Sequence, residues 1–532
     1  MTLETEIKKL QKKVSENQMS RRRFMQGAMA LGVGAIAPTL YSEAAKAAPK
    51  MGGVYRMGLG GANTGDALDP QNNGDVFMIN MNQGCVRNAL VEVNANGQAV
   101  PELAESLEPT ADASVWRVKL KPGVTFHDGK DLTPDDVIAS IEHHRGPDST
   151  SAAKSVAESM GEITKDGDTV VFTLESGNAD FPYLLSDYHV LMGPVDDTGK
   201  VDWMSGHGTG PYKVVEFEPG VRATMVRNEN YFKEGEGNFD EVHITAINDT
   251  AARMNAMVTG QVDAIARCDL KTAGLLENKP DVDVLQVPGT KHFTYPMDMR
   301  ATPFDSNDVR MALKYGIDRQ GFVNTVLRGY GSVGNDHPIS ASQNYHAKDL
   351  PQREYDIEKA KWHLKQAGME SLDLEISASD AAFGGAVDAT ELYAEQLKPA
   401  GINLTVKRVS PDGYWDNVWM QVPWSACYWG GRPTADWMFT IGYQAGGNWT
   451  DTFWNHARFE ELLIAGRAEL DDAKRNDIYV EMQTIVSNEG GVVVPCFANN
   501  VDAASTAMGK PDKIAGNWEL DGGRSAARWW FA

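Results

Sequence analysis

Residues 123–137 read Gly-Val-Thr-Phe-His-Asp-Gly-Lys-Asp-Leu-Thr-Pro-Asp-Asp-Val, a stretch that combines a turn with the start of a helix. Asp128-Gly129 is typical of a hairpin turn, because glycine accepts the positive φ that such turns need. Thr133 followed by Pro134 is typical of a helix start, where threonine caps free N–H groups. The preceding residues 116–121 alternate apolar and cationic side chains, which predicts a half-buried strand. Strand, turn and helix in this order indicate a mixed α/β fold.

Helix and strand signals also alternate further along the chain. Asp356 is placed to cap a helix that Gly368 ends. An apolar helix face over residues 478–486 is followed by a buried strand at 492–494. The length of 532 residues predicts two or three domains at about 100–200 residues each. Because the sequence has no solenoid repeat and no long low-complexity linker, we expect interleaved domains.

The composition narrows the class of protein. The chain is 42% hydrophobic and 23% charged, which is typical of a globular protein. Its net charge of −23 argues against nucleic acid as a partner, since binding to phosphates needs a basic surface. The same charge argues against attraction to an anionic membrane surface.

The N-terminus has the features of an export signal. Residues 1–47 hold eight Lys or Arg against four Glu, so the remaining chain is more acidic than the total. Arg21-Arg22-Arg23-Phe24 precedes an apolar run at 28–37, and the small-residue site Ala45-Lys46-Ala47 follows. This order predicts a signal peptide of the twin-arginine (Tat) type, cleaved near Ala47/Ala48. The alternative is a basic amphipathic helix with an anchor, but the apolar run is short of the roughly 20 residues that span a bilayer. We expect a soluble periplasmic protein.

Signatures of catalysis and metal binding are missing from the sequence. It contains no HExxH, GxSxG or phosphate-loop motif, and His143-His144 are adjacent, so they cannot share a metal as an i,i+4 pair can. The four cysteines (Cys85, Cys268, Cys427, Cys496) form no CxxC, and we expect them to be free and buried. We therefore expect no metal, no cofactor and no enzyme, with a Tat-exported periplasmic enzyme as the alternative.

Four groups of segments follow one another in order over most of the chain: residues 101–106, 123–129 and 132–137; 208–212 and 227–232; 308–313 and 316–319; and 355–361 and 367–368. Together they resemble the family 5 extracytoplasmic solute-binding proteins, the dipeptide- and oligopeptide-binding components of ABC importers. Each segment alone is weak, and their order and number carry the resemblance.

The resemblance implies a bilobal clamp of the periplasmic-binding-protein type II class, with an extra subdomain in the first lobe. The first lobe is expected at 48–287 and the second at 288–495, with a return to the first lobe at 496–532. A small-molecule ligand binds between the lobes, hinge closure buries it, and ABC permease subunits in the inner membrane receive it. We expect a monomer. A binding protein that serves a chemosensor is a further alternative.

Residues 414–454 are exceptionally aromatic. They hold seven of the 13 Trp and 12 aromatic residues in 41, against 9% overall. Ligand clefts are mostly apolar and aromatic with a few polar anchors, whereas the alternative is a Trp-rich core. We expect both, with Trp415, Trp419 and Phe439 in the core and with Tyr428 and Trp429 nearer the ligand.

Arg432 departs from the pattern of the peptide-binding relatives. The segment reads Cys427-Tyr428-Trp429-Gly430-Gly431-Arg432-Pro433-Thr434-Ala435-Asp436, and the relatives carry an Asp for the ligand's ammonium where Arg432 stands. A guanidinium there repels an ammonium and suits a carboxylate or phosphate. Asp436 is either a displaced amine anchor or the partner of Arg432. The ligand-binding candidates of this segment are Tyr428, Trp429, Gly430, Gly431, Arg432 and Asp436.

The resemblance also singles out Tyr295 and Asp298, near the first crossing between the lobes, and Gln83 and Cys85, where the first lobe often touches ligand. The ligand is expected to be a short peptide, an opine-like conjugate or a related carboxylate.

Overall fold

The computed structural model describes residues 7, 9, 28, 50–411 and 413–532. The predicted signal peptide lies almost entirely outside the described residues. Among the described residues, no helix has the length and apolar character needed to span a membrane.

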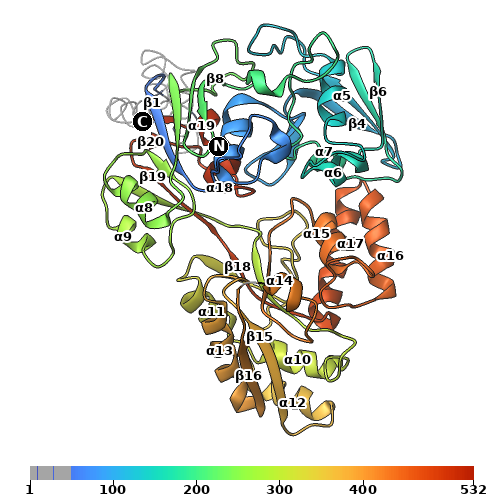
Figure 1. Cartoon of the computed structure of the whole chain (residues 1–532). Coiled ribbons are helices and arrows are strands. Elements are labelled where there is room, and N and C mark those ends of the chain that lie inside the picture. Colours follow the sequence, from blue (N-terminus) through green and yellow to red (C-terminus); the bar gives the residue numbers. More distant parts are fainter. Residues whose placement is uncertain (1–6, 8, 10–27, 29–49, 412) are drawn as a thin grey trace.

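The first lobe is built on a seven-stranded mixed sheet, shown at the upper left of Figure 1. Strand β1 lies parallel to β10 and β11, and the other pairs are antiparallel. Across the sheet the order is β12 (Val282–Val287), β19 (Asn500–Ser505), β11 (Ala264–Ile265), β1 (Val54–Leu59), β10 (Glu241–Ala246), β9 (Arg222–Arg227) and β8 (Tyr212–Glu218). Around it lie α4 (Val76–Met81), the π-helical turn η2 (Asn82–Val86), α8 (Thr250–Val258), α9 (Ala273–Glu277), α18 (Glu519–Gly522) and α19 (Ser525–Arg528).

A subdomain of the first lobe contains the stretch at 123–137. Its antiparallel sheet has the order β4 (Ala104–Pro109), β5 (Val115–Leu120), β7 (Thr169–Thr173) and β6 (Glu162–Asp166). Its helices are α5 (Pro134–Glu142), α6 (Lys154–Ser159) and α7 (Phe181–Leu184). The predicted elements are confirmed: β5 buries alternate residues, Gly129 has φ 90°, and Thr133 and Asp136 form a capping box at the start of α5.

The second lobe has a four-stranded sheet in the order β14 (Gly331–Val333), β18 (Val492–Ala498), β13 (His292–Pro296) and β17 (Cys427–Trp429). A parallel pair, β15 (Leu372–Ala378) and β16 (Ile402–Arg408), extends this lobe. Its helices are α10 (Asn307–Tyr315), α11 (Arg319–Val326), α12 (Ile357–Gln366), α13 (Ala386–Leu397), α14 (Tyr414–Asn417), α15 (Ala435–Tyr443), α16 (Ala457–Ala468) and α17 (Asp472–Glu489). Asp356 caps α12 as expected.

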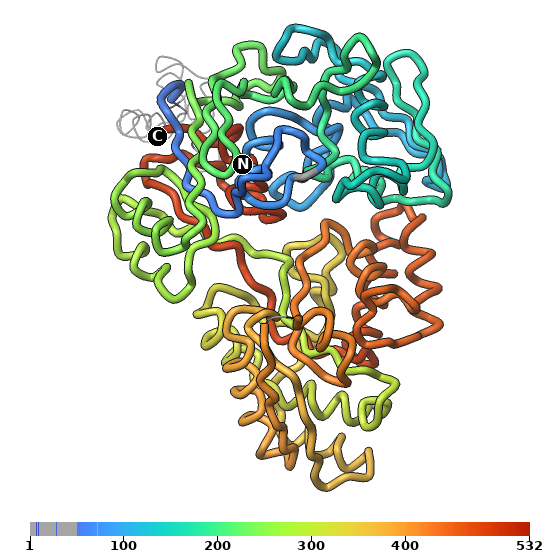
Figure 2. Tube along the Cα trace, in the orientation of Figure 1, coloured from blue at the N-terminus to red at the C-terminus, as the bar shows by residue number. Residues whose placement is uncertain are grey.

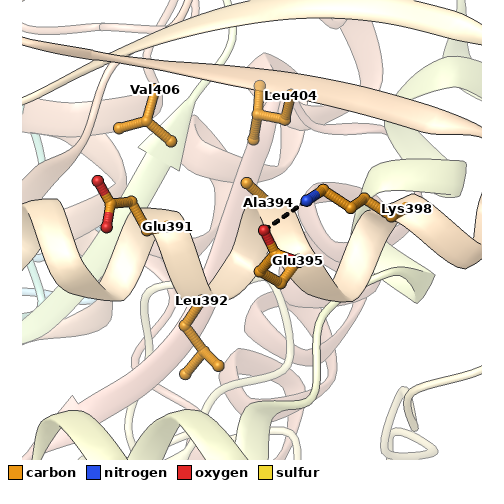
Figure 3. A pocket seen from close by; sticks show the side chains of 7 residues that line it. All are labelled: Glu391, Leu392, Ala394, Glu395, Lys398, Leu404 and Val406. Atoms are coloured by element: carbon orange, nitrogen blue, oxygen red, sulfur yellow. Dashed lines mark hydrogen bonds and ion pairs between the residues drawn. The ribbon is translucent and has the colours of Figure 1, made fainter.

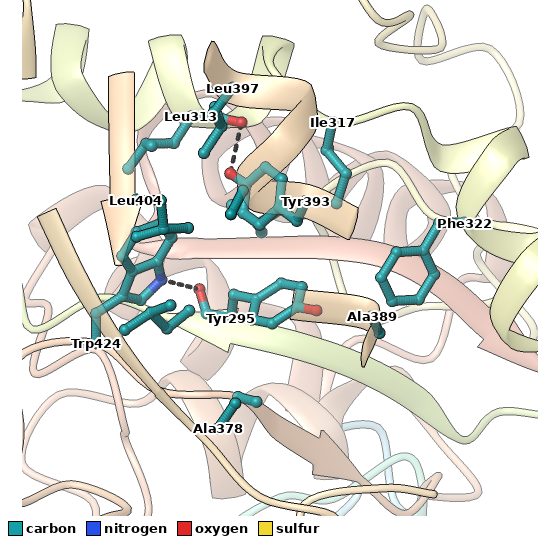
Figure 4. Packing of buried hydrophobic residues seen from close by; sticks show 14 of the residues in the cluster. Tyr295, Leu313, Ile317, Phe322, Ala378, Ala389, Tyr393, Leu397, Leu404 and Trp424 are labelled. Atoms are coloured by element: carbon teal, nitrogen blue, oxygen red, sulfur yellow. Dashed lines mark hydrogen bonds between the residues drawn. The ribbon is translucent and has the colours of Figure 1, made fainter. Parts of the chain in front are cut away.

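Two hydrophobic cores fill the second lobe. Figure 4 shows the core formed with α10–α13, in which the Tyr393 hydroxyl donates to Leu313 O at 2.8 Å and Trp424 Nε1 donates to Tyr295 O at 3.4 Å. The other core packs α15–α17 on the sheet and includes Phe439 and Trp429. Strand β13 is therefore buried on both faces.

Two segments join the lobes, and Figure 2 shows them side by side as a yellow-green and a red tube. One runs from β12 to β13 through residues 288–291, and the other runs from β18 to β19 through Asn499. Ala498 N donates to Lys291 O at 2.8 Å, and Val287 pairs with Asn500, so the segments are hydrogen-bonded to each other. The return to the first lobe falls at Asn499, three residues beyond the expected 496, because β18 stays in the second sheet to Ala498.

The lobes also meet away from the connecting segments. Figure 1 shows α15–α17 directly below α6 and α7 of the subdomain. Asp180, just before α7, pairs with Arg475 of α17 at 2.8 Å, and both side chains are buried. Ala179 N donates to Arg467 O at 2.7 Å, and Trp437 of α15 packs against the core of the subdomain. The lobes are thus held together on both sides of the region between them.

Candidate functional site

The aromatic segment forms an edge of the second sheet. Strand β17 pairs with β13, with Tyr428 opposite Phe293 and Trp429 opposite His292. Successive side chains of a strand point to opposite faces. Trp429 is therefore buried against the core with α15–α17, whereas Tyr428 is 37% exposed.

The structure corrects part of the expected division of the aromatic residues in this segment into core residues and residues near the ligand. Phe439 is in the core, as predicted, and Tyr428 is accessible. Trp429 is in the core and not exposed to ligand, and Trp415, expected in the core, is 38% exposed. Trp419 is half-buried. The sequence could not decide these positions, because the side that faces the core depends on which strand and helices pack against the segment.

Arg432 lies in the loop between β17 and α15. Its Nη1 donates to Gly430 O at 2.9 Å and to Gly431 O at 3.2 Å. Among the described residues, its Nε and Nη2 have no hydrogen-bond partner and the side chain has no ion pair. Burial lowers the pKa of Arg432 from its usual range, and the nearby hydroxyls of Tyr188 and Tyr428 partly oppose this. A half-buried cation with spare donors is suited to bind an anion.

Asp436 is not the partner of Arg432. Its carboxylate accepts from Arg467 Nε at 3.2 Å, at the first turn of α15. Burial raises the pKa of Asp436 to about 6, although Arg467 opposes this shift. The predicted Arg432–Asp436 pair is therefore wrong, and Asp436 is engaged within its own lobe instead of free to anchor an amine.

The first lobe contributes residues that the sequence did not indicate. Tyr188 lies close enough to Arg432 for the two to influence each other's pKa, and its ring is 4.9 Å from Trp518 and 4.0 Å from His189. Arg267 pairs with Asp75 at 2.7 Å and with Glu519 at 2.5 Å. No local motif marks these residues, because the fold assembles them from distant parts of the chain.

The connecting segments approach the same site. The Lys291 ammonium lies 4.9 Å from the centre of the Tyr428 ring. Gly431 passes so close to Thr290 that a Cβ atom would lie 1.4 Å from Thr290 Oγ1. The loop that carries Arg432 is thus fitted against the first crossing between the lobes.

Several other candidates prove to be structural. Tyr295 is fully buried in the core of the second lobe, where Thr390 donates to its hydroxyl at 3.3 Å. Cys85 is fully buried in the core of the first lobe, and burial raises the pKa of its thiol well above the usual range. Neither residue can touch a ligand without disrupting a core, so both predictions are corrected.

Asp298 and Gln83 have different surroundings. Asp298 accepts from Arg300 Nε at 2.9 Å and Nη2 at 2.8 Å. Burial opposes ionisation of Asp298, but these bonds hold its pKa below the usual range. Gln83 is buried in η2, and its Oε1 has no hydrogen-bond partner among the described residues. Gln83 therefore stays a candidate for polar contact with a ligand.

The cysteines and possible metal sites add no chemistry. All four cysteines are free and buried, as expected. Within the described ranges, no group of three or more His, Cys, Asp or Glu side chains is placed to hold a metal ion.

A surface depression elsewhere on the second lobe carries no site. Figure 3 shows it between α13 and β16. Its volume is about 400 Å³, and Arg432 is not among its lining residues. Its exposed Lys398 and Glu395 pair with each other at 2.5 Å. The third charged side chain that lines it, Glu391, pairs with Arg408 at 2.9 Å. All three charges are therefore already paired, and the depression offers no free anchor for a ligand.

Two α/β lobes joined by adjacent crossing segments define a clamp of the binding-protein class. The family of bacterial extracellular solute-binding proteins, family 5 Middle, matches residues 98–451, and the chain belongs to this family.

Two curated relatives are similar to parts of the chain. The oligopeptide-binding protein AppA of Bacillus subtilis (strain 168) is 29% identical over 61% of this chain and 65% of its own length. Heme-binding protein A of Haemophilus influenzae is 27% identical over 53% of this chain and 56% of its own length. The match thus spans less than two thirds of each of these relatives.

Solved structures are similar over nearly the whole fold. HbpA2 from Haemophilus parasuis has a TM-score of 0.77 at 20% identity, covering 86% of this chain and 96% of its own. AgaA from A. tumefacien R10, solved with agropinic acid, has a TM-score of 0.69 at 23% identity, covering 90% and 99%. These likenesses confirm the bilobal type II fold that the sequence predicted.

Proposed function

We propose that this protein is the periplasmic substrate-binding component of an ABC importer, which captures a small organic anion between its lobes. Membership of the family and the two-lobed fold support this role. The single observation that favours an anion is Arg432, a half-buried guanidinium with spare donors and no ion pair among the described residues.

The proposed ligand is a short peptide, an opine-like conjugate or a related carboxylate. Relatives are named for oligopeptides and for heme, and one similar structure holds agropinic acid. In this chain the ligand's carboxylate is held by Arg432, with Gln83 and Tyr188 offering polar contacts from the first lobe. The ligand bridges both lobes, so it binds the closed clamp more tightly than the open one. Tat-dependent export and delivery to inner-membrane permease subunits complete the proposal.

Calorimetric titration of the purified mature protein with a panel of carboxylates tests the anchor. Loss of a charged partner in a closed site costs about 2–5 kcal/mol, so Arg432→Ala should weaken binding by a factor of about 30 or more. Arg432→Lys should weaken it less, because the charge stays but the planar fork is lost. Arg408→Ala, at an exposed arginine of the same lobe, is the matched control. Unchanged affinity for every carboxylate in Arg432→Ala would overturn the anchor.

A further inference from the structure

Four aromatic side chains beside Arg432 form one continuous surface, here called the aromatic platform: Trp415, Trp419, Tyr428 and Trp449. Trp415 contacts Tyr428 and Trp419 with ring centres 5.7 and 5.6 Å apart, and Trp419 contacts Trp449 at 6.3 Å. Trp449 is 46% exposed, and Trp415 and Tyr428 are exposed to a similar extent. Figure 1 places α14, which carries Trp415, in the half of the second lobe nearer the first lobe.

A buried carboxylate fixes the platform from below. Trp419 and the buried Trp429 both donate their indole N–H to Asp451 Oδ2, each at 3.3 Å. The Trp429 ring in turn contacts Trp419 at 6.3 Å and Trp449 at 6.2 Å. Burying Asp451 is costly, and burial raises its pKa to about 7. The two hydrogen bonds to Asp451 hold the indole rings of Trp419 and Trp429 in fixed orientations.

Contiguous aromatic rings exposed to solvent are unfavourable unless something covers them, and such patches mark binding surfaces. The charges around this patch indicate what covers it. The Lys291 ammonium lies over Tyr428, and Arg432 follows four residues along the chain. Two cations beside a ring surface complement an anion that also carries a flat apolar group.

We propose that the aromatic platform binds an aromatic or heteroaromatic ring of the transported solute, whose carboxylate is held by Arg432. The inference rests on the proposed function and narrows its ligand class to organic anions that carry a ring close to the carboxylate. Asp451 is a positioning residue that acts through Trp419 and Trp429. Indole faces also attract quaternary ammonium groups, but the neighbouring Lys291 and Arg432 oppose a cation at this place.

Four probes separate the contributions of ring and charge in calorimetric titrations. N-benzoylglycine carries ring and carboxylate, N-acetylglycine lacks the ring, N-benzoylglycine amide lacks the charge, and choline tests a cation. We expect N-benzoylglycine to bind most tightly and choline not to bind. The preference for N-benzoylglycine over N-acetylglycine measures the platform, whereas the preference over the amide measures Arg432.

Substitutions then test the platform itself. An aromatic contact contributes about 0.5–1.5 kcal/mol, so Trp449→Leu should weaken N-benzoylglycine binding about two- to tenfold and leave N-acetylglycine unchanged. Trp362→Leu, at a tryptophan of α12 that is 55% exposed, is the control and should change neither. Asp451→Leu should reduce the preference for N-benzoylglycine over N-acetylglycine. Asp451→Asn keeps an oxygen that accepts the indole N–H groups, so this variant should keep the preference of the wild type.

The outcomes distinguish the two proposals. Equal binding of N-benzoylglycine and N-acetylglycine, or a ring preference that survives Trp449→Leu and Asp451→Leu, overturns the platform and leaves the Arg432 anchor standing. Equal binding of N-benzoylglycine and its amide, both weakened by Trp449→Leu, overturns the anchor and leaves the platform standing. Choline binding that Trp449→Leu abolishes identifies a cation site and overturns the inferred ligand class. Binding of none of the probes overturns both proposals.

Discussion

Closure of the clamp should depend on the ion pair between Asp180 and Arg475. The pair joins the subdomain of the first lobe to α17 at 2.8 Å, and the side chains are only 7% and 6% exposed. Asp180→Asn is the cleaner perturbation, since Arg475 also donates to Gly466 O within its own lobe. Removing one partner of a buried pair costs about 3–5 kcal/mol, because the other charge stays buried without compensation.

This cost applies only when the lobes are closed, since opening hydrates both side chains. Asp180→Asn should therefore shift the closed-to-open ratio toward open by a factor of about 10² to several times 10³. Small-angle scattering should show a larger radius of gyration, and calorimetry should show weaker ligand binding, while the unfolding temperature of each lobe changes little.

Two controls make the result specific. Asp166→Asn breaks an exposed pair with Arg117, which is worth about 0–1 kcal/mol, and should leave the radius unchanged. Replacing both partners, as Asp180→Leu with Arg475→Met, should restore closure, because an apolar pair of similar size often substitutes for a buried ion pair. If Asp180→Asn lowers the unfolding temperature without changing the radius or the affinity, the pair stabilises the fold and not the closed clamp, and the reasoning is refuted.

Two further predictions concern the candidate site. Burial raises the pKa of Asp451 to about 7, so the folded protein holds this proton more tightly than the unfolded chain, and stability should fall as pH rises from about 4 to 7. The loss in the free energy of unfolding is on the order of 4 kcal/mol. In urea unfolding across that pH range, the stability of Asp451→Asn should decline less than that of the wild type. Parallel curves of stability against pH would contradict the raised pKa of Asp451. Gly431→Ala places a Cβ against Thr290, an overpacking that typically costs about 1–3 kcal/mol of stability, and the resulting shift of the loop should displace Arg432 and weaken carboxylate binding. Gly430→Ala is the matched control, because a Cβ atom there would meet Arg432 Nη1 at an ordinary contact distance of 3.7 Å. Equal affinities of the two variants would argue against the close fit.

Local chemistry predicted the elements of the fold well. The cap at Thr133 and the alternation in β5 are set by neighbours a few residues apart, so they can be read without knowledge of the tertiary structure. The buried position of Tyr295 is not predictable from the local sequence, because β13 is an interior strand that is buried on both faces. Such a strand has no alternation to separate core from surface.

The candidate site was less predictable, since its contacts span long stretches of chain. Asp451 binds indoles 22 and 32 residues away, and nothing adjacent to it marks that role. For a similar reason, Trp415, expected in the core, is exposed, and Trp429, expected near the ligand, is buried. The composition shows that the segment is aromatic, but the pairing of β17 with β13 decides that Trp429 faces the core, and the placement of α14 decides that Trp415 does not.

The placement of Arg432 couples binding to closure through the backbone itself. On one side, Gly431 fits against Thr290 in the first connecting segment. On the other side, Arg432 leads directly into α15, whose Trp437 packs on the subdomain of the first lobe. Opening of the lobes would therefore separate Trp437 from the subdomain and increase the distance from Arg432 to Tyr188. An anion held by Arg432 and contacted from the first lobe stabilises the arrangement in which the lobes are in contact. It therefore binds the closed clamp more tightly than the open one, as a clamp requires.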